Sequence, residues 1–247
     1  MMRHALNRFY WKLERLFHPG LRYSQLHYRD MLESAVQQGC DWLDLGCGHQ
    51  LFASWMAKDE KRLASRSRKL IGIDLDWEGL RKNTIVSGRV YGNLQSLPFE
   101  PNTFDLVTAN MVVEHLDEPA IVLQQIHRVL RTGGRFIFHT PNFRSLIMRL
   151  AAAIPESLKK RMIRILENRK DEDVFVTFYR MNTFDDIRRA AAANGFVVEQ
   201  LRAVSTSAAT GILGPLAIFE LLYLRFIERP AHEERRSNLL VVLQKVA

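Results

Sequence analysis

The chain has 247 residues, 47% of them hydrophobic and 25% charged, which argues for a folded domain with a sizeable core and against disorder. Its net charge of +8 fits an anionic partner, but no nucleic-acid-binding motif accompanies the charge, so nucleic acid is not expected as a partner. Two cysteines, Cys40 and Cys47, exclude a disulfide framework and a four-cysteine zinc site, and Cys47 is expected to pack as a small apolar residue.

Residues 1–39 show the apolar spacing of helices, interleaved with basic side chains, and Gly39 ends the second of them. From residue 40 onward, short apolar runs alternate with helical patterns. The predicted strands are 42–45, 69–75, 89–91, 103–109 and 135–139, and the helices between them begin at 51 or cover 77–87 and 119–130. This alternation is typical of a parallel sheet with helices on both faces.

The pattern changes after residue 142. Residues 143–170 predict a helical stretch that is basic in its second half. Thr183 resembles a helix N-cap, because Asp186 three residues later completes a signal similar to a capping box. Further on, segment 211–227 is very apolar but contains glycine, proline and charged residues, so it predicts a buried or interfacial helix rather than a membrane span.

Two more strands, at 196–205 and 238–245, complete the predicted sheet. The expected fold class is α/β, with a doubly wound, seven-stranded, mostly parallel sheet and helical insertions that cap it. We predict one domain over 1–247. Its parts are the N-terminal helices (1–39), a core (40–142), a helical cap (143–182) and a C-terminal core (183–247) with an apolar insertion at 207–237.

A glycine loop directly after the first strand carries the strongest chemical signal. Gly46 and Gly48 would let the backbone approach a ligand at the carboxyl edge of the sheet. Leu51 stands where a dinucleotide fingerprint has its third glycine, and Asp44 before the loop would repel a pyrophosphate. Asp44 suits a cationic ligand, such as an amino group or a sulfonium. A tight structural turn is the alternative reading of this loop.

The next two strands also end in polar residues. Asp74 ends the second strand, 26 residues after Gly48, where a carboxylate can accept hydrogen bonds from both hydroxyls of a ribose. A surface or helix-capping role is the alternative for Asp74. Beyond the third strand, the amide of Asn93 could bond an adenine edge, with Leu94 as an apolar wall.

Five segments in this order resemble the class I S-adenosylmethionine-dependent methyltransferases, in the branch that contains quinone-biosynthesis and glycan-cluster enzymes. The segments are DLGCG, IGID, GNLQSLPFEPNTFDLV, VVEHL and RVLRTGGRFIF. The resemblance covers 40–142, and more loosely 173–205. It implies S-adenosyl-L-methionine as cofactor and a Rossmann-like methyltransferase fold.

The resemblance also implies a role for each matching position. Asp44, Gly46 and Gly48 would line the methionine end of the cofactor, and Asn110 would sit near the sulfonium. Asp74 would hold the ribose, and the positions implied to lie at the adenine are Leu75, Asn93 and Leu94. The chain departs from the family pattern twice. Gln50 stands where a small residue is usual, and Asn93 stands where the family commonly has an aspartate.

Three side chains are candidates for a general base: Glu114, His115 and His139. The family resemblance equally allows the Glu114–His115 pair to be structural, and packing is the favoured alternative for His139. No metal is assigned, although metal-assisted oxygen methylation through the Glu114–His115 pair stays open. Tyr179, Arg180 and Asn182 are further polar candidates for the cleft.

The sequence therefore predicts a methyltransferase that acts on a small-molecule, lipid-linked or glycan acceptor. We expect it in the cytoplasm, and peripheral membrane contact through 158–170 and 211–227 is a second expectation. Two other functions are left open: a non-catalytic binding module on the same fold, and a nicotinamide-dependent oxidoreductase. The acceptor itself does not follow from the fold.

Overall fold

The computed structural model describes residues 2–153, 176–206 and 217–246. A seven-stranded sheet runs through its centre in the order β3-β2-β1-β4-β5-β7-β6, and only the pairings of β7 are antiparallel. The strands are β1 (Asp41–Leu45), β2 (Lys69–Asp74), β3 (Gly88–Tyr91), β4 (Phe104–Asn110), β5 (Leu130–Pro141), β6 (Phe196–Val204) and β7 (Asn238–Lys245). The predicted α/β class and the mostly parallel seven-stranded sheet are confirmed.

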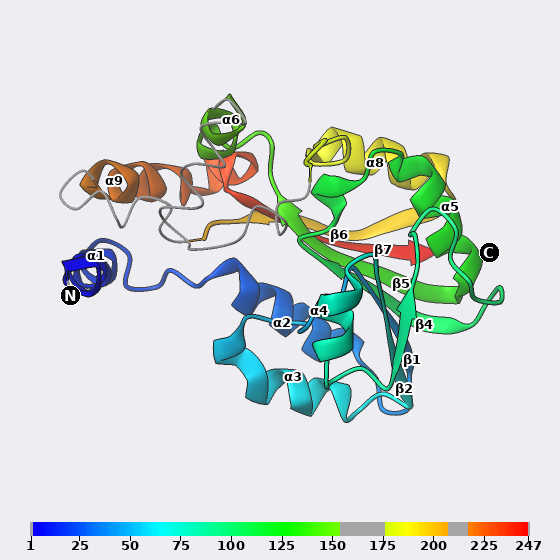
Figure 1. Ribbon diagram of the computed structural model, residues 1–247. Coiled ribbons are helices and arrows are strands. Elements are labelled where there is room, and N and C mark those ends of the chain that lie inside the picture. Colours follow the sequence, from blue (N-terminus) through cyan, green and yellow to red (C-terminus); the bar gives the residue numbers. More distant parts are fainter. Residues whose placement is uncertain (1, 154–175, 207–216, 247) are drawn as a thin grey trace.

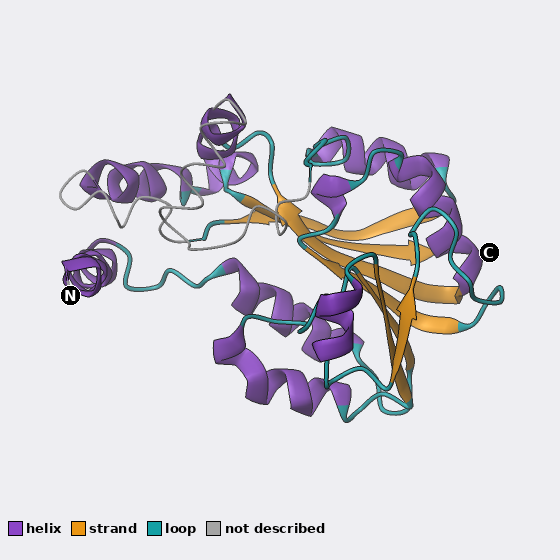
Figure 2. Cartoon of the chain, in the orientation of Figure 1, coloured by secondary structure: helices purple, strands orange, loops and turns teal. Residues whose placement is uncertain are grey.

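Helices cover both faces of the sheet (Figures 1 and 2). On one face lie α2 (Ser24–Ala35), α3 (Ala57–Ala64) and α4 (Trp77–Lys82), and on the other α5 (Pro119–Val129) and α8 (Phe184–Ala193). Successive strand residues point to opposite faces, so Trp42 packs in the core under α2 and α3, while Leu43 packs in the core under α5 and α8. The continuous apolar runs of the strands follow from this two-sided burial.

Two helix boundaries and one strand boundary differ from the predicted ones, each for a local reason. The helix expected from Leu51 begins later, with a short 3₁₀ turn (η1, Ser54–Met56), because the Leu51 amide donates to the buried Glu60 carboxylate. Helix α4 ends at Lys82 instead of 87, because the Asn83 side chain accepts from the amides of Ile85 and Val86.

The third difference concerns the glycines at 133 and 134, which were expected to precede the fifth strand. Strand β5 already begins at Leu130, which pairs with Phe104 across an irregularity in the β4–β5 register. The prediction of a strand start at 135 was therefore wrong, because the turn residues are absorbed into the bulged strand.

Outside the sheet, α1 (Met2–Phe17) and α9 (Ala217–Ile227) lie side by side at one end of the molecule (Figure 1). They share a separate small core of Tyr10, Leu221, Leu224 and Ile227. Helix α6 (Leu146–Ala153) lies near them, and a 3₁₀ segment, η5 (Pro230–Arg235), leads from α9 into β7. Most of the predicted basic stretch, 154–170, and the first part of the apolar insertion, 207–216, lie outside the described residues. No helix in the described ranges is long and apolar enough to cross a bilayer.

Candidate functional site

A cavity of about 400 Å³ lies at the carboxyl ends of β1, β2, β3 and β4. Five of the predicted cofactor residues border it: Gly46, Asp74, Leu75, Asn93 and Leu94. The carboxyl ends of neighbouring parallel strands meet at one edge of an open sheet, where ligands of such folds bind. The cavity therefore gathers residues from three separate sequence motifs.

The glycine loop lies against this cavity with its backbone in left-handed conformations. Gly46 has φ +59°, and a Cβ built there would lie 2.5 Å from Cγ2 of Val112, which also borders the cavity. Gly48 has φ +44°, and its amide donates to Oδ2 of Asp74 at 2.7 Å. Cys47 between them is 2% exposed, and burial raises the pKa of its thiol, as expected for an apolar packing role.

The Asp74 carboxylate is held in place by two backbone amides. Oδ2 accepts from Gly48, and Oδ1 accepts from the Asp76 amide at 2.8 Å. Each carboxylate oxygen has a further lone pair. Asp74 has no ion-pair partner among the described residues, so an oriented anionic acceptor borders the cavity. The helix-capping alternative is not what the hydrogen bonds show, because the capped amides belong to the glycine loop and to Asp76.

Asp44 lies beneath the loop and does not border the cavity. Its carboxylate is 4% exposed and accepts from Oγ1 of Thr108 at 2.5 Å, and Thr108 in turn accepts from the Trp42 indole N–H. Burial raises the pKa of Asp44 to about 7, against the opposing effect of the Thr108 hydrogen bond. A cationic group placed at the loop would favour the ionised form of this carboxyl.

Asn110 ends β4, and its amide is committed to neighbouring residues. Its Nδ2 donates to Gln25 of α2 and to the Leu51 carbonyl, and its Oδ1 accepts from Gln25. His139 lies beside it on β5, with Nδ1 2.9 Å from the same Oδ1. Asn110 therefore ties α2 and the segment after the glycine loop to the sheet.

His139 is buried in the interior. It is 1% exposed and stacks on Tyr28, and burial lowers the pKa of its ring to about 3. A ring with that pKa stays neutral at physiological pH. This geometry agrees with the packing alternative for His139 rather than with a base at the cavity.

The two other base candidates lie on a 3₁₀ turn, η2 (Val113–His115), after β4. Glu114 is buried and accepts from Oγ1 of Thr140, and burial raises its pKa against the pull of His115. Its backbone carbonyl accepts from the amides of Phe178 and Tyr179. His115 borders the cavity, with Nδ1 2.8 Å from the Val176 carbonyl. His115 is thus the base candidate that reaches the cavity.

The further polar candidates lie around this turn without bordering the cavity. Asn182 is fully buried and donates to Oγ1 of Thr140 and to the Pro141 carbonyl. Arg180 pairs with Asp117 at 2.8 Å, and Tyr179 stacks on Phe143. These contacts hold residues 179–182 against the segment before α5 and the end of β5.

Sequence reasoning missed several apolar residues of the cavity. Met111, Val112, Val176 and Phe178 border it, and Met111 and Phe178 are 39% and 41% exposed. Met111 also has φ +59°, an uncommon value for a residue with a side chain. The position of Met111 after β4 was the available signal, whereas nothing in the sequence placed Val176 and Phe178 opposite the first strands.

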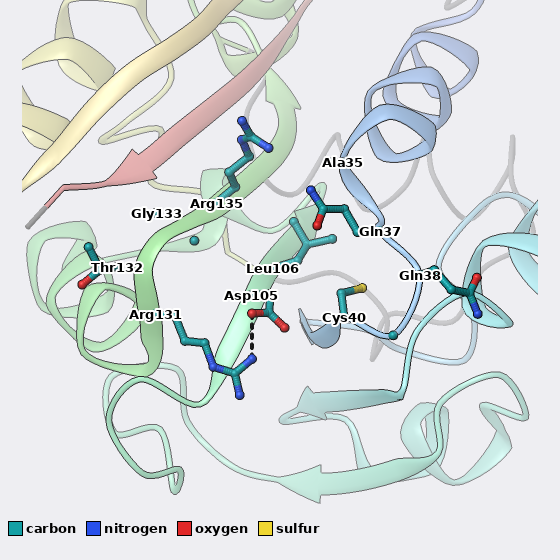
Figure 3. A pocket seen from close by; sticks show the side chains of 12 residues that line it. Ala35, Gln37, Gln38, Cys40, Asp105, Leu106, Arg131, Thr132, Gly133 and Arg135 are labelled. Carbon is teal, nitrogen blue, oxygen red and sulfur yellow. Dashed lines mark ion pairs between the residues drawn. The ribbon is translucent and has the colours of Figure 1, made fainter.

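A second hollow, of about 380 Å³, lies at the opposite, amino edge of the sheet (Figure 3). There the Arg131 guanidinium binds Asp105 at 2.7 Å and Asp41 at 2.9 Å. These charges satisfy one another, so the hollow offers little to a ligand. Among the residues that the structure describes, no cluster of three histidine, cysteine or acidic side chains is arranged to hold a metal ion.

Part of the chain resembles a known protein family. Residues 43–138 match the family model described as a methyltransferase domain. This stretch is similar to the class I, S-adenosylmethionine-dependent methyltransferases, and it contains the glycine loop, Asp74 and Asn93. S-adenosyl-L-methionine is the cofactor that the family implies.

Two curated relatives show how far the likeness extends. A ubiquinone biosynthesis O-methyltransferase of Aliivibrio fischeri is 30% identical over 142 residues, which cover 54% of this chain and 58% of that protein. An uncharacterised 37.1 kDa protein in a Streptomyces fradiae transposon is 34% identical over 127 residues, or 48% of this chain and 36% of that protein. The chain thus spans between about a third and three fifths of these relatives.

Solved structures confirm the fold of the methyltransferase domain and its surroundings. An S-adenosylmethionine-dependent methyltransferase from Mesorhizobium loti has a TM-score of 0.56 at 18% identity, over 87% of this chain and 96% of that chain. The [4+2]-cyclase SpnF has a TM-score of 0.54 at 16% identity, over 90% of this chain and 81% of that chain. Neighbours named for different reactions share this fold, so the reaction must be argued from the site.

Proposed function

We propose that this chain binds S-adenosyl-L-methionine in the carboxyl-edge cavity and transfers its methyl group to a small-molecule, lipid-linked or glycan acceptor. The observation that carries the proposal is the position of Asp74, oriented by the Gly48 and Asp76 amides at the border of a cavity with apolar Leu75 and Leu94. A carboxylate beside apolar walls suits a ribose that carries a flat base.

The residues fit each part of this cofactor. Asp74 would accept from the ribose hydroxyls, and Leu75, Asn93 and Leu94 would border the adenine. Gly46 and Gly48, in left-handed conformations, would let the methionine end approach the backbone. Asp44 beneath the loop would supply negative charge toward the cationic amino and sulfonium groups.

The cofactor supplies a methyl group on an already good leaving group, so the chain's residues chiefly orient the acceptor and exclude water. Orientation of this kind supplies about 7–11 kcal/mol in well-aligned systems. Met111, Val112 and Phe178 would form the apolar wall that excludes water.

His115 would take the proton of the acceptor. The Val176 carbonyl can only accept, so Nδ1 of the neutral ring carries hydrogen and Nε2 carries the lone pair. Nε2 lies 4.0 Å from Oε1 of Glu114, and an ionised Glu114 would stabilise the imidazolium that forms. General base catalysis typically contributes about 10²–10⁴-fold.

Calorimetric titration with S-adenosylhomocysteine tests the binding site. Asp74→Ala and Asp74→Asn should weaken affinity by roughly 10- to 100-fold, because hydrogen bonds to a charged group contribute about 1.5–3 kcal/mol. Glu78→Ala on α4, an exposed carboxylate paired with Arg81, is the matched control and should bind as the natural chain does. Unchanged affinity in both Asp74 variants would refute the proposed site.

Two outcomes would favour the alternative functions. Tight binding of the cofactor with no S-adenosylhomocysteine released in the presence of small-molecule, lipid and glycan fractions would favour a non-catalytic binding module. Saturable NADH binding that Asp74→Ala abolishes would favour an oxidoreductase.

A further inference from the structure

Helix α9 is apolar on both of its sides. Its inner side packs against Tyr10 of α1 through Leu221, Leu224 and Ile227. Its outer side exposes Phe219 at 67%, Leu222 at 48% and Phe226 at 40%. A surface helix normally turns polar side chains to water, and large apolar residues gathered on one exposed face indicate an interaction surface.

The charges on this outer face have one sign. Arg225 and Arg229 are exposed, and no described residue forms an ion pair with either of them. The Arg229 guanidinium lies over the Phe226 ring, 5.9 Å from its centroid. Residues 217–229 contain two acidic side chains. Glu220 is only 9% exposed, and Glu228 lies 3.7 Å from the guanidinium of Arg236.

The neighbouring helix continues this character. On α1, Trp11 is 46% exposed and Leu16 is 75% exposed, next in sequence to Lys12 and Arg15. Aromatic and aliphatic side chains interleaved with unpaired cations are typical of helices that lie at the surface of a bilayer. Both helices therefore combine apolar and cationic groups on their solvent side.

Helix α9 is fastened to the sheet. Arg236 donates to the Ile227 and Glu228 carbonyls at the end of α9 and to the Ala203 carbonyl of β6. Asn142, just past β5, donates to the carbonyls of Glu234 and Arg236. These bonds fix the orientation of α9 relative to the end of β5, beside the strand edge where the cavity lies.

We propose that the outer face of α9, defined by Phe219, Leu222, Arg225 and Phe226 together with Arg229 just past the helix, docks onto the surface of an anionic lipid bilayer. The cations match lipid phosphates, and the aromatic rings and Leu222 enter the boundary between headgroups and acyl chains. A protein partner would need complementary acidic and apolar groups together, whereas an anionic bilayer presents both everywhere. Docking does not depend on methyl transfer, so the two proposals can fail separately.

Co-sedimentation of the full chain with vesicles tests the docking surface. The chain should bind phosphatidylglycerol–phosphatidylcholine vesicles and bind pure phosphatidylcholine much less. Phe219→Ser with Leu222→Ser should reduce partitioning at least about tenfold, because the docked chain would no longer bury these two apolar side chains in the bilayer. Arg225→Gln with Arg229→Gln should reduce it by roughly 25-fold, at about fivefold per cation near an anionic surface.

Matched controls come from α5 and α8, which lie away from α9 (Figure 1). Ile121→Ser on α5 and Arg188→Gln on α8 remove an exposed apolar residue and an exposed cation, and both should leave partitioning unchanged. Equal binding to anionic and neutral vesicles, or equal binding by the α9 variants and the natural chain, would overturn the proposal. Loss of a dimer in size-exclusion chromatography of the Phe219/Leu222 variant, without any vesicle binding, would instead make this face a contact between copies.

Fluorescence gives a measurement that needs no change in α9. In a Trp55→Phe, Trp77→Phe background, Trp11 is the exposed indole and Trp42 is fully buried. Brominated anionic lipids should quench Trp11 in that background. Absence of quenching at saturating vesicles would show that this end of the molecule does not reach the bilayer.

Discussion

Asp44 shows how one buried side chain links stability to pH. Its folded-state pKa of about 7 lies above the ordinary value of 3.8, so the folded chain holds a proton that the unfolded chain has released between those values. The protonated carboxyl contributes to folding stability in full below about pH 4, and this contribution is lost as the pH rises through about 7. The cause is desolvation, which the hydrogen bond from Thr108 only partly offsets.

Asp44→Asn should remove this pH dependence while keeping an acceptor for Thr108. The free energy of unfolding of the natural chain should fall, relative to the variant, by roughly 1–4 kcal/mol between about pH 4 and pH 7. Urea unfolding across this range measures the difference. Parallel profiles for the two proteins would show that Asp44 does not titrate there.

Gly46 tests whether the loop and Val112 fit together as described. Gly46→Ala places a Cβ on a residue with a left-handed φ of +59°, only 2.5 Å from Cγ2 of Val112. The variant protein should therefore unfold at a lower temperature and bind S-adenosylhomocysteine less tightly than the natural chain. Gly133→Ala is the matched control, because its φ is +78° and nothing lies within 4 Å of the added Cβ. It should cost only the backbone strain of about 1–2 kcal/mol.

Val112→Ala should rescue Gly46→Ala, because it removes the methyl groups that the new Cβ meets. The double variant should be close to Gly133→Ala in stability, as measured by thermal unfolding. If Val112→Ala does not restore stability, the destabilisation by Gly46→Ala comes from backbone strain alone.

At the scale of elements, single polar side chains set the start of α8 and the end of α4. Thr183 begins α8 in extended backbone, and its side chain accepts from the Asp186 amide, as the capping signal in the sequence predicted. Asn83 ends α4 because its side chain accepts from the amides of Ile85 and Val86, although the sequence pattern predicted a longer helix. An N-cap has a recognisable spacing, whereas the Asn83 turn depends on the packing of its buried side chain.

Thr183→Ala should lower the free energy of unfolding by about 1 kcal/mol, because an amide of the first turn loses its acceptor. Thr183→Ser keeps the hydroxyl and should restore most of the loss. Chemical unfolding of both variants provides the measurement, and equal loss in Ala and Ser would assign the effect to the lost methyl group instead of the cap.

On the scale of the whole molecule, the two edges of the sheet differ in how their carboxylates are paired. At the amino edge, Asp41 is neutralised by Arg68 and Arg131, which hold its pKa below the usual range. At the carboxyl edge, Asp74 has amide donors but no ion pair in the described part of the chain. An acceptor left without a cation is available to a ligand, and this difference separates the candidate site from the hollow at the amino edge.

The sequence by itself predicted the succession of strands and helices along the chain, the glycine loop and the position of Asp74 at a strand end, because periodicity and glycine turns depend on neighbouring residues. Only the tertiary structure decided that Asp44 and His139 are buried, that Asn110 is tied to α2, and that Val176 and Phe178 face the cavity. The pairing of α1 with α9 was decided at the same level. Such positions depend on contacts between residues far apart in the chain, which local hydrogen bonding and periodicity do not encode.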